Sequence, residues 1–150
     1  MDIPHDWLTL FDGTQIEAKL HVSALLATVD EKNRPHLAFL SVGEVFVWQP
    51  RRVAVALWPT SRSTANFRRT GHATLYAVAD GSVWEALLYL KRQVSSGLAL
   101  FDTDVENVAC HTAPYAEVTG LVGFRLLDPA SVTDRWRKQI TVLRDFVATS

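Results

Sequence analysis

Residues 52–78 read RVAVALWPTSRSTANFRRTGHATLYAV, and this stretch decides the fold. Its two ends, residues 53–58 and 72–79, are apolar runs with the length and composition of short β-strands. The polar segment between them predicts a short surface helix over residues 65–69, with a hydroxyl residue as N-cap and Gly71 closing it. The stretch therefore indicates a strand, a loop, a short helix and a second strand.

The chain before this stretch has the same strand-and-turn character. Residues 23–30 and 36–42 are apolar runs separated by the polar residues 31–35, which predicts two strands joined by a tight turn. Asn33 lies in that turn, where a residue that tolerates a positive φ is favoured. Residues 45–48 predict a third short strand, so the pattern is an antiparallel meander.

The chain after this stretch continues the meander. Asp80-Gly81 is a strong hairpin signal, so a strand should follow it. Residues 82–94 also fit an amphipathic helix by spacing, but the hairpin favours a strand. Residues 98–102 and 105–109 are short apolar pieces, and residues 117–127 predict a further strand.

Helical spacing occurs at the two ends of the sequence. Residues 4–11 predict a short amphipathic helix, and residues 16–20 a further helical turn. Asp128-Pro129 announces a C-terminal amphipathic helix that runs to about Phe146. About seven short strands with these helices predict a mainly β fold, a small β-barrel decorated by helices, with residues 1–150 forming one domain.

The composition limits the classes of function. The 150 residues are 48% hydrophobic and 21% charged with a net charge of −1, which predicts a globular protein without the basic excess of nucleic-acid binders. A single cysteine excludes a disulfide framework within the chain and suits a reducing cytoplasm. No basic leader or apolar run of membrane length is present, so we expect a soluble, cytoplasmic protein that binds neither nucleic acid nor a membrane.

Familiar catalytic and metal-binding motifs are absent from the sequence. It contains no H-E-x-x-H, paired-cysteine, GxGxxG, P-loop or G-x-S-x-G pattern. The five histidines are scattered, so no metal site is predicted, and Cys110 is interpreted as a small buried hydrophobic residue rather than a nucleophile. No catalytic residue can be assigned from these patterns.

The loop that follows residues 53–58 carries the chemistry. Hydroxyls and a guanidinium lie together at a strand-to-helix transition, where free backbone N–H groups already favour an anion. Arginine offers a bidentate fork to phosphate, and hydroxyls can bind the remaining oxygens. The loop is therefore either a phosphate cradle or an ordinary capped helix start. Its residues are Thr60, Ser61, Arg62, Ser63 and Thr64, followed by Asn66.

Residues 25–40, LLATVDEKNRPHLAFL, together with residues 52–78, resemble the FMN-binding split-barrel proteins related to pyridoxamine 5′-phosphate oxidase. The resemblance is close over these two segments and looser to about Leu127. It implies a split β-barrel of the FMN-binding type that forms a homodimer with flavin in the groove between subunits. It also favours the strand over residues 82–94.

The resemblance implies a set of cofactor-binding residues. Ser61 and Arg62 match the family's phosphate-binding serine and arginine, whereas Ser63 stands where the family has lysine and Leu57 where it usually has threonine. Losing the lysine removes a charge-assisted contact worth about 1.5–3 kcal/mol. The implied residues are Ala38, Phe39, Leu40, Ser41, Leu57, Trp58, Thr60, Ser61, Arg62, Ser63 and Asn66.

The five tryptophans divide by position. Trp7 and Trp136 fall on apolar helix faces and are interpreted as packing residues, whereas Trp58 precedes the loop and is suited either to packing or to flanking a flavin. The resemblance implies an FMN-dependent oxidoreductase acting on a small molecule. The alternative is a non-catalytic module on the same barrel that binds or senses flavin, F420 or haem.

Overall fold

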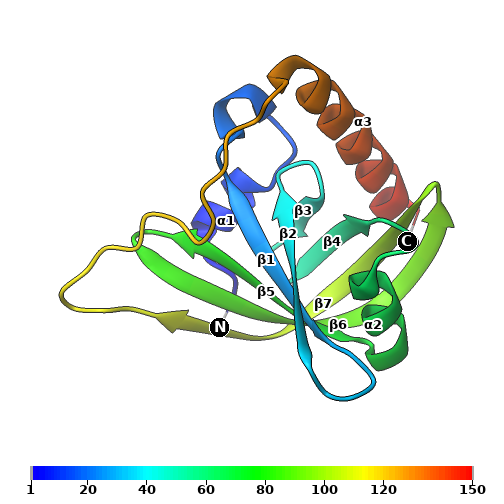
Figure 1. The fold of residues 1–150 in the computed structure, drawn as a ribbon, viewed down its shortest axis with the longest axis horizontal. Coiled ribbons are helices and arrows are strands. Elements are labelled where there is room, and N and C mark those ends of the chain that lie inside the picture. The colour runs from blue at the N-terminus through cyan, green and yellow to red at the C-terminus, as the bar shows by residue number, and fades with distance from the viewer. Residues whose placement is uncertain (1, 150) are drawn as a thin grey trace.

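The computed structural model describes residues 2–149, in which seven antiparallel strands form one curled sheet (Figure 1). The strands lie in the order β2-β1-β5-β6-β7-β4-β3, so β2 and β3 are its edges although they are neighbours in the chain. A mainly β, split-barrel architecture with flanking helices is thereby confirmed. The strands are β1 (Ser23–Val29), β2 (Pro35–Ser41), β3 (Val45–Gln49), β4 (Arg52–Leu57), β5 (His72–Ala79), β6 (Ser82–Ser96) and β7 (Leu98–His111). The helices are α1 (His5–Leu10), α2 (Arg62–Thr70) and α3 (Pro129–Ala148), with a 3₁₀ turn, η1, at Ile16–Lys19.

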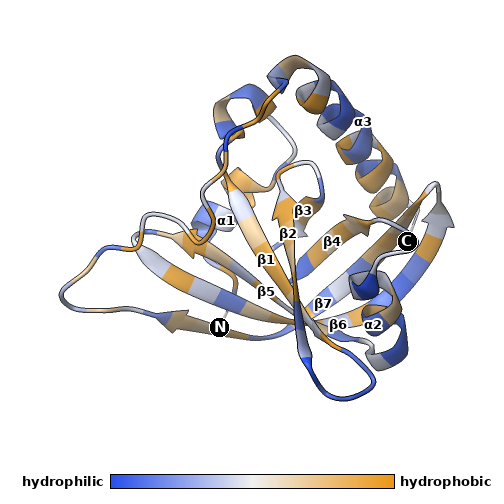
Figure 2. Cartoon of the chain, viewed as in Figure 1, coloured by the Kyte–Doolittle hydropathy of each residue, from blue (hydrophilic) through white to orange (hydrophobic). Residues whose placement is uncertain are grey.

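The turns that set the strand register are formed by residues that tolerate a positive φ or that hydrogen-bond to the backbone of the turn. Asn33 has φ 60° in the β1–β2 turn, and the Asp80-Gly81 pair has φ 51° and 73° between β5 and β6, as the sequence predicts. In the first turn the Asp30 carboxylate accepts hydrogen bonds from the backbone N–H groups of Lys32 and Arg34, both at 2.9 Å. Figure 2 shows this loop as a hydrophilic tip beyond apolar strands.

Helix α2 begins three residues earlier than residues 65–69 predict. Ser61 is its N-cap, and its hydroxyl accepts the backbone N–H of Thr64 at 3.1 Å. At the other end Gly71 has φ 73° and its N–H donates to the carbonyl of Phe67, a left-handed closure that glycine adopts without strain. The expected hydroxyl cap and glycine closure are confirmed.

Helix α3 packs along β3 and β4 (Figure 1). Asp128 caps its first turn and Pro129 lies at its start, as predicted, and Figure 2 shows apolar and polar residues alternating along it. Its Trp136 is buried against the β2–β3 turn, where a Cβ on Gly43 would stand 2.3 Å from the indole ring. Only glycine allows the turn and the helix to approach this closely. Among residues 2–149, no helix is long and apolar enough to cross a membrane.

The strand expected over residues 117–127 is wrong. That part of the chain belongs to an irregular connecting segment, residues 112–128, which links β7 to α3 (Figure 1). Strand β7 pairs with β6 along nearly its whole length and with β4 from Ala99 to Asp104, and residues 117–127 pair with neither strand. Gly120 and Gly123 also weaken strand formation. The segment is held by bonds such as the one from the Val118 N–H to the Gly81 carbonyl, at 2.8 Å.

The two short apolar pieces at 98–102 and 105–109 join into the single strand β7. The polar residues where the two pieces meet have hydrogen-bond partners inside the sheet, so they do not interrupt the strand. Asp102, 1% exposed, accepts hydrogen bonds from Arg52 and from the indole of Trp48, and Thr103 donates to the Val53 carbonyl at 2.8 Å. A buried polar group with partners costs a strand little.

Alternate residues of β1, β2, β5 and β6 point to two different faces. The inner face contributes Leu26, Leu75 and Leu88, all fully buried, to the core. Residues in α1 and α2 or next to them complete that core, among them Trp7, Phe11 and Phe67. The opposite side, called the outer face here, carries Leu25, Leu37, Phe39, Tyr76 and Tyr89.

Candidate functional site

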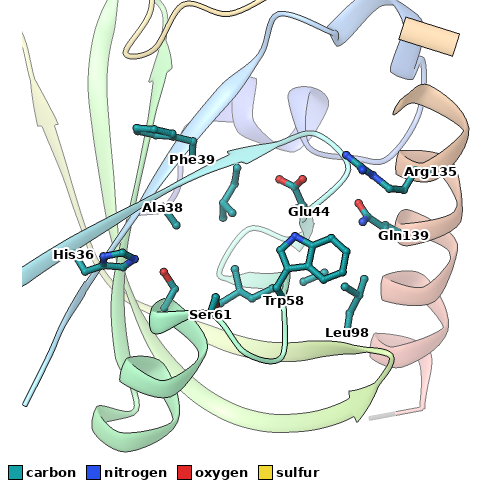
Figure 3. Close-up of a pocket in the computed structure, with 13 residues that line it drawn as sticks. His36, Ala38, Phe39, Glu44, Trp58, Ser61, Leu98, Arg135 and Gln139 are labelled. Atoms are coloured by element: carbon teal, nitrogen blue, oxygen red, sulfur yellow. The ribbon is translucent and has the colours of Figure 1, made fainter. Parts of the chain in front are cut away.

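A pocket of about 190 Å³ opens where β2, the end of β4, the start of α2, and α3 meet (Figure 3). Most of its surface is apolar, with polar groups at two ends, which is the usual character of a small-molecule site. Seven of the eleven residues expected to bind a cofactor line it. They are Ala38, Phe39, Leu40, Leu57, Trp58, Ser61 and Ser63.

The apolar wall of the pocket comes from two strands. Residues of β2 alternate in exposure, so that Leu40 is buried whereas Phe39 is 68% exposed at the rim. Trp58, directly after β4, is 63% exposed, and Figure 3 shows its indole beside the pocket between Ser61 and Gln139. The Trp58 ring, open beside the pocket, offers a flat surface to a planar ligand, whereas the Phe39 side chain points away from the pocket (Figure 3).

One end of the pocket is the N-terminus of α2. Ser63 lies in the first turn and is only 2% exposed, yet its hydroxyl has no hydrogen-bond partner within residues 2–149. Arg62, the preceding residue, is exposed, and its guanidinium makes neither a hydrogen bond nor an ion pair with any described residue. The first-turn N–H groups and the helix dipole add positive potential at the same place. This end of the pocket is suited to an anion.

Four expected residues lie outside the pocket lining: Ser41, Thr60, Arg62 and Asn66. Asn66 is buried, and its amide donates to Thr28 at 3.1 Å and accepts from Arg69 at 3.2 Å, so it ties α2 to β1. Ser41 closes the β2–β3 turn, because its carbonyl accepts the Glu44 N–H and its hydroxyl accepts the Gly43 N–H, both at 3.1 Å. Thr60 and Arg62 are both exposed, and they flank the lining residue Ser61 in the sequence.

Three polar residues at the other end of the pocket were not predicted from the sequence. Glu44 comes from the β2–β3 turn, and Arg135 and Gln139 come from α3 (Figure 3). Burial raises the pKa of the Glu44 carboxyl above its ordinary value, while hydrogen bonds from Ser41 and the charge of Arg135 act in the opposite direction. The lining residues that sequence reasoning missed are His36, Glu44, Ala56, Leu98, Arg135 and Gln139.

The arrangement can hold a ligand that is anionic at one end and flat and apolar in the middle, with hydrogen-bonding groups at the far end. The pocket walls offer hydroxyls, backbone N–H groups and the Trp58 ring rather than a nucleophile paired with a base. Cys110 is exposed, not buried as expected, and does not line the pocket. Among residues 2–149 there is no group of three or more His, Cys, Asp or Glu side chains that could hold a metal ion.

The sequence is 31% identical over 144 residues to the uncharacterised protein YclD of Bacillus subtilis strain 168, a match that covers 90% of this chain and 91% of the relative. The chain belongs to the YclD family. No protein-family model matches the sequence.

Solved structures define the fold that this YclD-family chain adopts. It resembles a protein from Lactobacillus delbrueckii suggested to be a pyridoxamine 5′-phosphate oxidase, with a TM-score of 0.56 and 15% identity, over 72% of this chain and 93% of that one. An FMN-binding protein from Syntrophomonas wolfei aligns with a TM-score of 0.53 and 14% identity, over 72% and 88% of the two chains. An F420 reductase aligns with a TM-score of 0.54 and 7% identity, over 71% and 98%. The fold is the split barrel of flavin-binding proteins.

Proposed function

We propose that the chain binds FMN, with the phosphate at the start of α2 and the ring along β2 and Trp58. The observation that carries the proposal is the Ser63 hydroxyl. A buried hydroxyl without a partner costs about 1–3 kcal/mol, so such groups usually await a ligand or water. Ser63 faces the pocket at the N-terminus of a capped helix, next to a guanidinium with no other engagement. An oxyanion would satisfy all three groups together.

The donor set fits a phosphate although the family's lysine is replaced by Ser63. A serine supplies one hydrogen bond without charge, and the charge is left to Arg62 and the helix dipole. We therefore expect weaker binding than in relatives that keep both cations. The loss of one charge-assisted hydrogen bond corresponds to about 1.5–3 kcal/mol, or about one to two decades in affinity.

We further propose that two copies of the chain form a homodimer that completes the site. Ligand pockets are usually about 300–1,000 Å³, whereas this one has about 190 Å³. On the same strand that lines the pocket, Leu37 and Phe39 are 51% and 68% exposed. A second copy laid against the outer face would cover these side chains and enlarge the pocket by adding a second wall.

With FMN bound, the protein is proposed to act as an oxidoreductase on a small molecule. The flavin supplies the hydride and electron chemistry when bound, and the chain's own residues bind it, orient it and exclude water. Trp58 and the β2 backbone would shield one side of the ring. Glu44 holds a buried proton-binding site within the same pocket.

A second candidate is an F420-binding protein of the same fold, favoured by the likeness to the F420 reductase. F420 also carries a phosphate next to its ribityl chain, so the start of α2 would serve it equally. A non-catalytic flavin- or haem-binding role uses the same pocket. These alternatives differ in the identity of the bound molecule, which can be determined by a single experiment on the purified protein.

The test is the visible spectrum of the purified protein, followed by denaturation and mass analysis of what is released. Release of FMN, or thermal stabilisation by added FMN, supports the proposal; release of F420 or haem, or no stabilisation by FMN, overturns it. Arg62→Ala should then weaken FMN binding about 10- to 100-fold. The matched control is Arg68→Ala, because Arg68 lies on the same helix but is engaged with Gln93 and Ser95.

A further inference from the structure

The end of the pocket opposite α2 carries a second set of uncommitted polar groups. Gln139 lines the pocket from α3, and its side-chain oxygen is buried with no hydrogen-bond partner within residues 2–149. Arg135, one helical turn earlier, makes no hydrogen bond or ion pair with a described residue. Figure 3 shows both side chains reaching from α3 toward Glu44 and Trp58.

Glu44 balances the charge at this end. One of its oxygens accepts the Ser41 N–H at 2.6 Å, and Arg135 lies near enough to act on its charge. A guanidinium and a carboxylate together give little net attraction for a simple anion or cation. Two groups remain without a hydrogen-bond partner: the N–H donors of the Arg135 guanidinium and the side-chain oxygen of Gln139. These groups suit a neutral part of a ligand in which carbonyl oxygens lie next to an N–H, because the guanidinium donates to a carbonyl and the Gln139 oxygen accepts the N–H.

We propose that Arg135 and Gln139 bind the imide edge, –CO–NH–CO–, of the flavin ring whose phosphate is held at the start of α2. This assignment rests on the proposed function and adds to it a recognition site built by α3. The two orphaned pocket atoms, the Ser63 hydroxyl and the Gln139 oxygen, then mark the two ends of one ligand. The Gln139 oxygen accepts the imide N–H, and the Arg135 guanidinium donates to a neighbouring carbonyl.

The arrangement of the pocket agrees with a single long ligand. In Figure 3 Ser61 stands at one end, Trp58 lies in the middle and Gln139 at the other end, so the flat indole separates the anion-binding end from the imide-binding end. The same order, phosphate, ribityl chain and ring, exists in FMN. The C-terminal helix is therefore a part of the cofactor site rather than only a cover for β3 and β4.

The test compares FMN with 3-methyl-FMN, in which the imide N–H is replaced by N–CH₃. The unmodified protein should bind FMN about 5- to 100-fold more tightly, because the methyl group leaves the Gln139 oxygen unpaired. Gln139→Leu should bind both flavins within about threefold of each other. Equal binding of the two flavins by the unmodified protein, or undiminished discrimination by Gln139→Leu, overturns the assignment.

A second readout separates binding from folding. Arg135→Gln should make the reduction potential of the bound flavin more negative, because a cation beside the ring stabilises the charge gained on reduction. Lys138→Gln removes the same charge from the same helix at a site paired with Asp134, and should leave the potential unchanged. Equal shifts in both variants overturn the role of Arg135. If the unmodified protein binds neither flavin, the proposed function fails and this assignment fails with it.

Discussion

The inner and outer faces of the sheet are built by alternate residues of the same strands, yet only one of them is covered. On the inner face Leu26, Leu75 and Leu88 are fully buried beneath α1 and α2. On the outer face Leu37 and Phe39 are more than half exposed. Antiparallel sheets often leave one face to water, but that face is then polar. The apolar residues here indicate that the chain packs one face itself and leaves the other for a partner surface.

The largest expected difference comes from truncating a phenylalanine on each face. Phe67 is fully buried and stacks on Phe101 with ring centroids 4.8 Å apart, so Phe67→Ala should lower the free energy of unfolding by about 3–5 kcal/mol. Phe39→Ala should change it by less than about 0.5 kcal/mol in the isolated chain. Urea unfolding at low protein concentration measures both. Similar losses would mean that the outer face is not free in the single chain.

The cap of α2 should separate stability from ligand binding. Ser61→Ala removes the hydroxyl that accepts the Thr64 N–H and should cost about 0.5–2 kcal/mol. Ser61→Asp keeps an acceptor there and should retain most of the stability, but its charge should repel a phosphate. Thermal melts with and without FMN measure the two effects. Unweakened FMN binding by Ser61→Asp would contradict an anion site at this end of the pocket.

The outer face is tested directly by a charge that leaves the core untouched. Leu37→Asp adds a carboxylate at a residue that does not line the pocket, and should alter the stability of the isolated chain by less than about 0.5 kcal/mol. If two copies pair through this face, the variant should sediment or scatter light as a monomer. The control is Tyr115→Asp, at a 90% exposed site in the connecting segment, which should leave the molar mass unchanged.

The smallest effect concerns pH at the pocket. Burial raises the pKa of Glu44 above its ordinary value of 4.5, so the folded protein holds this proton more tightly than the unfolded chain does. The stabilisation is present below pH 4.5 and is lost as the pH rises through the folded pKa. Glu44→Gln should therefore gain stability relative to the unmodified protein between pH 4.5 and neutrality. A steeper pH dependence in the variant would reverse the sign inferred here.

Sequence reasoning was most accurate where a single residue type decides the backbone. Asn33 and the Asp80-Gly81 pair require or tolerate positive φ, and they fix the two hairpins that frame β1, β2, β5 and β6. It failed over residues 117–127, where an apolar pattern resembles a strand but the segment pairs with none of the seven strands. Pairing partners are a property of the whole sheet, so residues such as Leu121 and Phe124 carry no local sign that their segment stays unpaired.

The lining residues of the pocket likewise divide into those that could be predicted from the sequence and those that could not. The residues that the sequence grouped, such as Trp58, Ser61 and Ser63, are close together in the chain, and the structure brings them to one pocket. Arg135 and Gln139 come from a helix more than 70 residues later, and only the packing of α3 beside β4 brings them to the site. Their spacing of four residues on an amphipathic helix would have shown that they share a face, without showing what that face meets.

The contact between Gly43 and Trp136 fixes more than a turn. Because the indole rests directly on the backbone of the β2–β3 turn, it sets the rotation of α3, and a helix turns about 100° for each residue. Arg135 and Gln139 flank that contact on the same helix, so an insertion within residues 112–128, which precede the helix, would move neither side chain as long as the indole kept its place. An insertion between Trp136 and Gln139 would instead turn Gln139 about 100° away from the pocket.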